Sequence, residues 1–360
     1  MLDGHPHGWQ KLCEQSRAKT EYMDTLLART TAEQRRDLFV ATGERMGISA
    51  QLVEKDFWVC WILRRLFTLP EIAGHLTFKG GTSLSKAFGI IERFSEDIDL
   101  IVERHWLGVP DEPDGSILQW LKKVKQACRR KIRDELIPML AKDAGNRLGA
   151  EPFELFTNQT SNEDPRIFFF RYPTVLSETP PGYVQPVVKM EFNARSDSEP
   201  AHEAIARPYV GIEFPDVLPA SETRLRCLAP ERTLFEKTTL LHEELLRPIA
   251  LGMRPRLSRH YYDLAQMLRH GIGEHALADL ALYERVVRHR ALFFPNDWMG
   301  DYSAMLNGPL ILKPTDERLP EWRRDYEQMT VMFFREPPKF DNLLIAADEF
   351  AAKINAARGL

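Results

Sequence analysis

The sequence predicts an α+β fold, in which a central α/β core is flanked by helical N-terminal and C-terminal parts. Apolar residues recur at helical spacing before residue 70 and again after Pro230. Between these regions, short apolar and aromatic runs alternate with Gly- and Pro-containing turns, which is typical of strands. At roughly 150 residues per domain, the chain is long enough for two or three folding units. We place their boundaries at 1–70, 71–225 and 226–360.

Composition excludes several classes of protein. The chain has 48 Lys and Arg against 52 Asp and Glu, so a nucleic-acid partner needs a local basic patch. The 4 cysteines are spread singly, which excludes a Cys-rich zinc module. The first residues lack the apolar core of a signal peptide, and the apolar run Phe57–Leu63 is far shorter than the roughly 20 residues that span a bilayer. We expect a cytoplasmic protein with no membrane partner.

The N-terminal part is expected to be helical. Thr31 followed by an acidic first turn indicates a helix start, and a second helix is expected from Ser49 to Pro70. The pattern then changes to shorter elements. These are a strand at Leu76–Phe78, a turn at Lys79–Gly81, a helix at Thr82–Ile91 and a buried strand at Asp97–Val102.

The rest of the chain continues the same alternation. Residues 117–142 are expected to form a strongly basic helix. Strand signals run from 153 to 214, the clearest at Ile167–Phe170 and Val184–Phe192, with a Pro-Pro-Gly turn between them. From Pro230 onward the pattern is helical, with Gly and Pro interruptions.

The segment Lys79–Ser83 has the properties of a phosphate-binding turn. Gly80 and Gly81 allow the backbone to turn sharply and to approach a ligand closely. The following helix offers free N–H groups, and the hydroxyls of Thr82 and Ser83 lie at that end. By themselves, the glycines are equally compatible with a plain turn from strand to helix.

Asp97 and Asp99 are two residues apart on the next expected strand, so both side chains leave the same face. Two adjacent carboxylates repel each other unless a cation lies between them, which points to a divalent metal. The alternative is solvated charge on an edge strand. The surrounding residues are apolar, however, and burying an unneutralised pair there is costly. The combination of turn, helix and carboxylate pair favours nucleotide chemistry.

This arrangement resembles the polymerase β-like nucleotidyltransferase superfamily, and more closely the AbiEii/AbiGii toxin family. The resemblance rests on Lys-Gly-Gly-Thr-Ser-Leu at 79–84 and on Arg-x-Ser-x-Asp-Ile-Asp at 93–99. Further motifs of that family are similar to Val53–Phe57, Glu231–Lys237 and Ser258–Leu264. The resemblance covers roughly residues 50–265. It implies a polymerase β-like core with a mixed β-sheet.

The resemblance also implies a third carboxylate on a neighbouring strand. Glu191 is the candidate, although the family often has Asp there, and Lys189 precedes it on the same face. Both residues are also compatible with a solvent-facing strand. Asp97, Asp99 and Glu191 are therefore expected to be catalytic and to hold Mg²⁺ or Mn²⁺. The expected nucleotide-binding residues are Lys79, Gly80, Gly81, Thr82, Ser83, Lys189, Lys237, Arg259 and Asp263.

Two of these assignments have a plain structural alternative. Arg259 and Asp263 are four residues apart and share a helix face, which also fits an intrahelical ion pair. The basic tract Lys122–Arg133 fits a solvated helix face. It fits an RNA-backbone contact nearly as well, with Lys122, Lys125 and Arg129 on one face.

The function that the resemblance implies is a metal-dependent nucleotidyltransferase toxin. It would transfer NMP from NTP to an acceptor, with the tRNA 3′ end as one candidate. It implies an antitoxin encoded nearby and a role in bacterial growth arrest or phage defence. Kinase-like modification of a protein is an alternative within the enzymes, and an NTP-sensing module without turnover is an alternative outside them. Three carboxylates favour an enzyme, because a binding module has no need of them.

Overall fold

The structure is a computed structural model that describes residues 21–113, 115–157, 166–176, 185–296, 298–299 and 302–360. The described residues form two compact units. Unit 1 takes its residues from 1–88 and 96–227, and unit 2 from 89–95 and 228–360. The three-part division at residues 70 and 225 stays a prediction.

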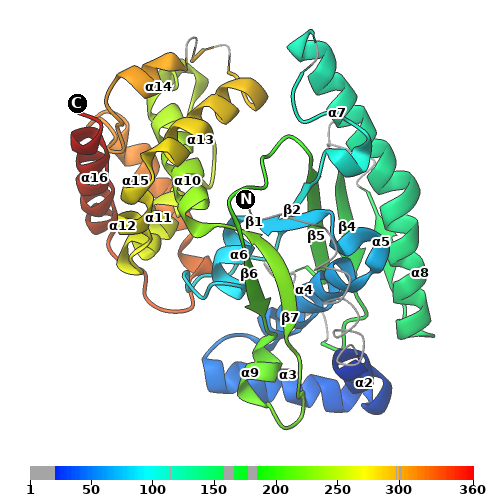
Figure 1. Ribbon diagram of the computed structural model, residues 1–360. Helices are drawn as coiled ribbons and strands as arrows, with labels where there is room; N and C mark the ends of the chain where they lie inside the picture. The colour runs from blue at the N-terminus through cyan, green and yellow to red at the C-terminus, as the bar shows by residue number, and fades with distance from the viewer. Residues whose placement is uncertain (1–20, 114, 158–165, 177–184, 297, 300–301) are drawn as a thin grey trace. The chain divides into compact units, whose positions relative to one another are not determined.

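Unit 1 is built on a seven-stranded mixed sheet with the strand order β3-β4-β5-β2-β1-β7-β6 (Figure 1). β2 runs antiparallel to β1 and parallel to β5, while β1 and β7 are parallel. The predicted α+β class with a mixed sheet is confirmed. The strands are β1 (Leu76–Lys79), β2 (Ile98–Val102), β3 (Glu154–Phe156), β4 (Ile167–Arg171), β5 (Val187–Asn193), β6 (Ala201–Ala206) and β7 (Thr223–Leu228).

The helices of unit 1 precede the sheet or lie between its strands. The basic helix expected at 117–142 is present and extends to Leu148 through a π-helical turn. The helices are α2 (Glu21–Arg29), α3 (Ala32–Met46), α4 (Ala50–Thr68), α5 (Pro70–Ala73), α6 (Gly80–Lys86), η1 (His105–Leu107), α7 (Ile117–Lys131), the π-turn η2 (Ile132–Leu136), α8 (Ile137–Leu148) and α9 (Tyr209–Glu213).

Helix α4 packs against one face of the sheet. Trp61 stacks on Phe170 of β4 with ring centroids 5.7 Å apart, and Trp58 stacks on Tyr172 at 5.6 Å. On β5, Val188, Met190 and Phe192 are buried, whereas the intervening side chains are partly exposed. The alternation therefore gives the sheet one apolar face and leaves the polar residues of β5 on the other.

Two sequence predictions differ from the structure. The helix expected to run to Ile91 ends at Lys86, and Gly89 has a φ of 64°. Left-handed backbone cannot continue a helix, so the apolar spacing beyond Lys86 reflects burial outside a helix. β7 lies beyond the region where strand signals were recognised. Residue 184 and the Pro-Pro-Gly turn lie outside the described residues, and β5 begins at Val187.

Unit 2 is mainly helical, and it includes one segment from much earlier in the chain, Gly89–Ser95. Arg93 forms an isolated β-bridge with Phe333, and the Phe94 N–H donates to the Met332 carbonyl at 2.7 Å. The predicted helical C-terminal part is confirmed. Its helices are α10 (Pro230–Leu246), η3 (Ile249–Leu251), α11 (Arg259–Arg269), α12 (Ile272–Ala278), α13 (Leu280–Phe293), α14 (Ser303–Asn307), α15 (Leu319–Gln328), η4 (Thr330–Met332) and α16 (Phe340–Ala357).

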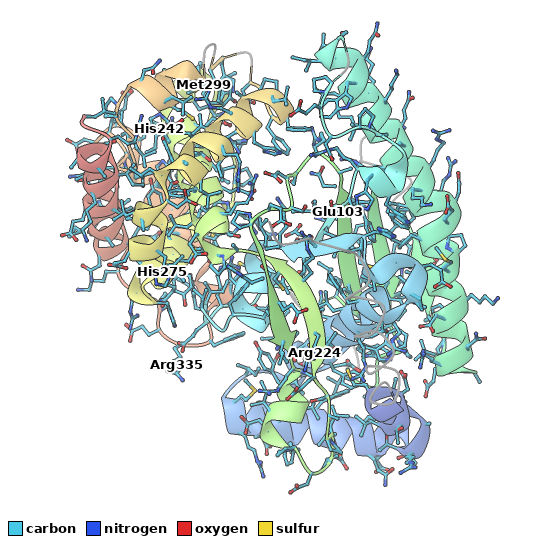
Figure 2. The ribbon with its side chains drawn as sticks, viewed as in Figure 1. Glu103, Arg224, His242, His275, Met299 and Arg335 are labelled. Atoms are coloured by element: carbon cyan, nitrogen blue, oxygen red, sulfur yellow. The ribbon has the colours of Figure 1, made fainter. Side chains whose placement is uncertain are left out.

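Polar side chains also link the strands of the sheet. Glu103, which follows β2 (Figure 2), accepts a hydrogen bond from Arg226 of β7 at 3.1 Å. Arg226 also donates to the Thr77 hydroxyl on the strand between them.

Across the ranges that the structure describes, we find no helix with both the length and the apolar composition that crossing a membrane requires.

Candidate active site

Gly80 lies where β1 ends and α6 begins, with a φ of 86°. A Cβ atom at this position would overlap a carboxylate oxygen of Asp99 on β2. Both the left-handed backbone and the close approach therefore require glycine. The turn expected at Lys79–Gly81 is a direct passage from strand to helix, and it places the backbone of α6 against Asp99.

The hydroxyls of Thr82 and Ser83 are buried and bonded to backbone. Thr82 Oγ1 donates to the carbonyl of Asp97 at 2.6 Å, and Ser83 Oγ donates to the carbonyl of Gly80 at 2.9 Å. Thr82 thus fixes the start of α6 to the segment that carries the first aspartate. Contact of either hydroxyl with a nucleotide stays a prediction.

Three predicted site residues form one row across the sheet. Lys79 of β1 is paired in register with Asp99 of β2, and Asp99 with Glu191 of β5. Residues paired in register share a face of the sheet, so these three side chains lie together. Asp97 precedes the first residue of β2, and its side chain is 40% exposed, close to the 38% of Glu191. The structure thus brings together the three carboxylates that the sequence predicted.

Burial and the neighbouring carboxylates both disfavour a charge on Asp99. Burial, together with the charges of Glu191 and Asp97, raises the pKa of Asp99 from 3.8 to about 7. Lys189 partly balances this charge. Its ammonium contacts the Glu191 carboxylate and lies 3.7 Å from Asp97 Oδ2. Three carboxylate groups thus lie close to a single ammonium group. Carboxylate oxygens are the ligands that hard divalent cations prefer, so the chemistry of these residues fits such a cation.

As the side chains stand, the metal geometry is incomplete. Within the residues that the structure describes, no group of three or more His, Cys, Asp and Glu side chains is arranged to hold a metal ion. The ammonium of Lys189 lies among the carboxylates that a cation would have to bring together. The three carboxylates therefore have the chemistry of metal ligands. Their oxygens do not yet point toward a common position where one ion could bind.

Three consecutive charged residues of α4 support this site, and their roles were missed by the sequence prediction. Glu54, Lys55 and Asp56 are 2%, 3% and 4% exposed, although such side chains are almost never buried unless they are paired. Their side chains point in different directions around the helix and reach three segments of unit 1. The signal in the sequence was a run of three charged residues inside a long, mostly apolar helix.

Two residues of the triplet, Lys55 and Asp56, contact segments that carry the site. Lys55 forms an ion pair with Glu96, the residue before Asp97, and donates to the Gln185 carbonyl at 3.1 Å. Asp56 forms an ion pair with Lys86, the last residue of α6. The helix α4 thereby holds both the end of α6 and the start of the segment that carries the carboxylates.

The third residue of the triplet and a neighbouring aromatic complete this support. Glu54 accepts from the Val175 N–H and from the Thr174 hydroxyl, both at 2.7 Å. The Lys86 ammonium lies 3.5 Å from the ring centroid of Tyr209, which stabilises the cation further.

Lys237 and Asp263 form a buried ion cluster in unit 2. Asp263 accepts two hydrogen bonds from Arg93, at 2.7 and 2.8 Å, and one from Lys237 at 2.7 Å. Burial alone would raise the pKa of Asp263, but the charges of Arg93 and Lys237 outweigh it and hold that pKa far below its usual value. Asp263 thus pairs with these two cations. No Arg259–Asp263 pair is found in the described part of the chain.

The predicted RNA-contacting residues Lys122, Lys125 and Arg129 are exposed on α7. Burial and the charges of Arg195, Arg166 and Arg129 lower the pKa of Lys125. The two additional arginines come from other segments of unit 1, and spacing along the helix gave no sign of them.

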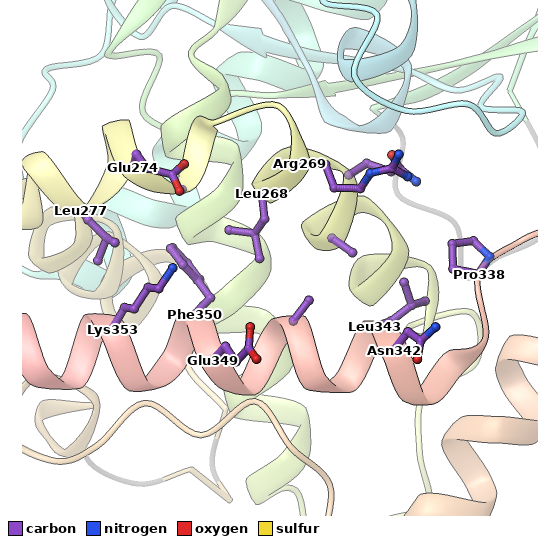
Figure 3. A pocket seen from close by; sticks show the side chains of 14 residues that line it. Leu268, Arg269, Glu274, Leu277, Pro338, Asn342, Leu343, Glu349, Phe350 and Lys353 are labelled. Carbon is purple, nitrogen blue, oxygen red and sulfur yellow. The ribbon is translucent and has the colours of Figure 1, made fainter.

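Unit 2 contains a cavity of about 380 Å³ between α11, α12 and α16 (Figure 3). Arg269, Glu274, Glu349 and Lys353 contribute charge to its lining, and Leu268 and Phe350 contribute apolar surface. The described residues that line it include none of the residues predicted to bind nucleotide, so we assign it no nucleotide chemistry.

Comparison with known proteins agrees with the class that the sheet and its carboxylates suggest. Residues 61–351 match the family model described as nucleotidyl transferase AbiEii toxin, type IV TA system. The chain therefore belongs to this family of nucleotidyltransferase toxins, as the sequence motifs predicted. It is an enzyme of the nucleotidyltransferase class.

The other comparisons add little. No curated protein matches the chain. One of the solved structures that match is MenT4, a nucleotidyltransferase toxin from Mycobacterium tuberculosis H37Rv. The alignment covers 92% of this chain and 98% of that one, with 16% sequence identity and a TM-score of 0.40. We transfer no residue role from it.

Proposed function

We propose that this toxin transfers a nucleoside monophosphate from an NTP to the 3′-terminal hydroxyl of an RNA, with the tRNA acceptor end as the first candidate. The observation that carries the proposal is the row Lys79–Asp99–Glu191, with Gly80 against the Asp99 carboxylate. The row combines oxygen ligands, a cation for phosphate and a backbone that a triphosphate can approach closely.

The row and its two neighbours, Asp97 and Lys189, would bind different parts of the substrate. Lys79 and Lys189 would offset the negative charge of the triphosphate. Asp97, Asp99 and Glu191 would hold Mg²⁺ or Mn²⁺, which when bound neutralises phosphate charge and activates the attacking hydroxyl. Glu191 would then exchange its contact with the Lys189 ammonium for the ion, leaving that ammonium available to phosphate.

The proposal extends to the surroundings of the enzyme. The predicted nucleotide contacts of Lys237, Arg259 and Asp263 stay outside this proposal, because Lys237 and Asp263 neutralise each other within unit 2. An antitoxin encoded nearby would restrain the toxin. Growth arrest in a bacterial cytoplasm, during phage infection or another stress, is the role that membership in a toxin family supports.

The test uses NTPs labelled at either end of the triphosphate. Label at the α-phosphate should pass to RNA in the presence of Mg²⁺, and label at the γ-phosphate should not. Asp99→Asn should abolish the transfer, while the exposed Asp316→Asn should leave it unchanged. Transfer of γ-label to protein would instead establish the kinase-like alternative. NTP binding without transfer of either label would establish the sensing module.

A further inference from the structure

The sheet of unit 1 carries a pair of aromatic residues beside the carboxylate row. Glu191 of β5 is paired in register with Ile167 of β4, and Lys189 of β5 with Phe169 of β4. Phe169 is in turn paired with Phe156 of β3. Residues paired in register share a face of the sheet, so both phenylalanines lie on the face that carries Lys189 and Glu191.

The burial of the residues along β4 agrees with this placement. Phe168 and Phe170 are buried, and Phe170 stacks on Trp61 of α4. Successive side chains of a strand leave opposite faces, so Phe169 points away from α4. Phe169 and Phe156 are both half-buried, in contrast to the core residues on either side of Phe169. Aromatic surface is therefore exposed on the same face as the carboxylates.

The two rings hold each other in a fixed arrangement. The rings of Phe156 and Phe169 are stacked, with centroids 5.4 Å apart and planes 23° apart. The guanidinium of Arg171 lies 5.1 Å from the centroid of Phe156 and is also paired with Glu154 at 3.1 Å. A ligand that stacks on these rings does not have to order them first, which favours binding. We call Phe156 and Phe169 the aromatic platform.

The aromatic platform begins close to the carboxylates and leads away from the glycine turn. Phe169 lies one strand from Glu191 and two residues along, which corresponds to about 8 Å between their Cα atoms. Phe156 lies one strand further out, on β3 at the end of the strand order. Gly80 follows β1, two strands from β5 on the opposite side. The platform is therefore on the side of the carboxylates that the triphosphate would leave open.

Flat rings on the face of a sheet suit the bases of a single-stranded nucleic acid. Every base has an aromatic face, and unpaired RNA bases are commonly stacked on phenylalanine side chains. The aromatic platform extends over two strands, β4 and β3, so it suits successive nucleotides better than the single base of an NTP. A protein acceptor would offer a hydroxyl but no run of bases.

We propose that Phe169 and Phe156 stack the unpaired bases at the 3′ end of the acceptor RNA and so bring its terminal hydroxyl to Asp99 and Glu191. This inference rests on the proposed nucleotidyl transfer and specifies how the acceptor is held. Stacking of this kind contributes affinity for any base, so the platform favours a single-stranded end without selecting its sequence.

The test replaces one ring of the aromatic platform. Phe169→Leu removes the stacking surface but keeps an apolar side chain, whereas Phe169→Tyr keeps a ring. The matched control is Phe214→Leu, because Phe214 is also half-buried and has the guanidinium of Arg45 4.0 Å from its centroid. Phe214 directly follows α9, which packs with α3 and α4.

Binding of a labelled single-stranded RNA is compared with binding of an abasic strand of the same length, over a range of salt concentrations. We expect Phe169→Leu to weaken RNA binding at least about fivefold, the lower limit of what stacking of one base contributes. Its affinity for the abasic strand and its slope of log affinity against log salt should stay unchanged, because phosphate contacts set that slope. Phe169→Tyr and Phe214→Leu should bind RNA as the wild type does.

Several outcomes would overturn the aromatic platform. They are unchanged RNA affinity in Phe169→Leu, an equal loss in Phe169→Tyr or Phe214→Leu, and an equal loss on the abasic strand. Reduced NTP affinity in Phe169→Leu would also overturn it, because the ring would then bind the base of the NTP. If the wild type transfers α-label to no RNA, the proposed function itself fails. If transfer to RNA occurs but Phe169→Leu matches its control, only this inference fails.

Discussion

Replacing Asp263 by Asn removes one negative charge from the buried cluster of unit 2 and hardly changes its shape. In the native chain this carboxylate neutralises Arg93 and Lys237, whose side chains are 3% and 8% exposed. The amide offers only one acceptor oxygen, so it cannot accept both bonds of Arg93 and the bond of Lys237. Both cations would lose the carboxylate that balances their charge in the interior.

The cost follows from this geometry. Removing one partner of a buried ion pair destabilises a protein by about 3–5 kcal/mol. With two cations affected, we expect the upper part of this range. Each kcal/mol lowers the Tm by about 2–4 °C in a protein of 150–250 residues. The Tm should therefore fall by roughly 10 °C or more. Lys237→Met should cost less, because Arg93 and Asp263 remain paired one to one.

Urea unfolding followed by circular dichroism measures the change in the free energy of unfolding. The control is Asp341→Asn, which breaks an exposed pair with Arg323 at 2.8 Å and should change stability by about 0–1 kcal/mol. NTP affinity is measured on the variants while they are folded. A loss below about 1 kcal/mol for Asp263→Asn, or lost NTP affinity at unchanged stability, would refute a role as internal counter-ion.

The remaining predictions concern the candidate active site and the effect of pH. Gly80→Ala should reduce label transfer at least tenfold, because its Cβ would overlap Asp99, while Gly74→Ala, with φ −76° and open space, should not. Lys55→Met should lower kcat about 10–100-fold through the loss of its pair with Glu96. It should cost less stability than Asp263→Asn, because the Glu96 carboxylate left behind is 36% exposed and keeps its contact with water. Because the pKa of Asp263 is lowered in the folded protein, its carboxylate stabilises the fold at pH values above 3.8, the usual pKa of the group. The difference in the free energy of unfolding between the wild type and Asp263→Asn, measured by urea unfolding, should therefore shrink as the pH falls below 3.8.

The sequence by itself determined the strand that carries the predicted catalytic aspartates and the turn that precedes it. Asp97 and Asp99 were recognisable because a strand places alternate residues on one face, and Gly80 because a ligand-approaching turn has no room for a Cβ. These are local properties. They depend on a few residues and on backbone geometry, which is why the mixed α+β class and the family could be predicted as well.

Only the tertiary structure decided which charges neutralise one another. Lys55 pairs with Glu96, 41 positions later, and Arg93 pairs with Asp263, 170 positions later. An ion pair depends on distance in space, and helical spacing suggested only the local partner Arg259 for Asp263. The turn at Gly80, by contrast, was recognisable in a short motif. The register that aligns Lys79, Asp99 and Glu191 across three strands depends on how the sheet pairs, and no short motif contains that information.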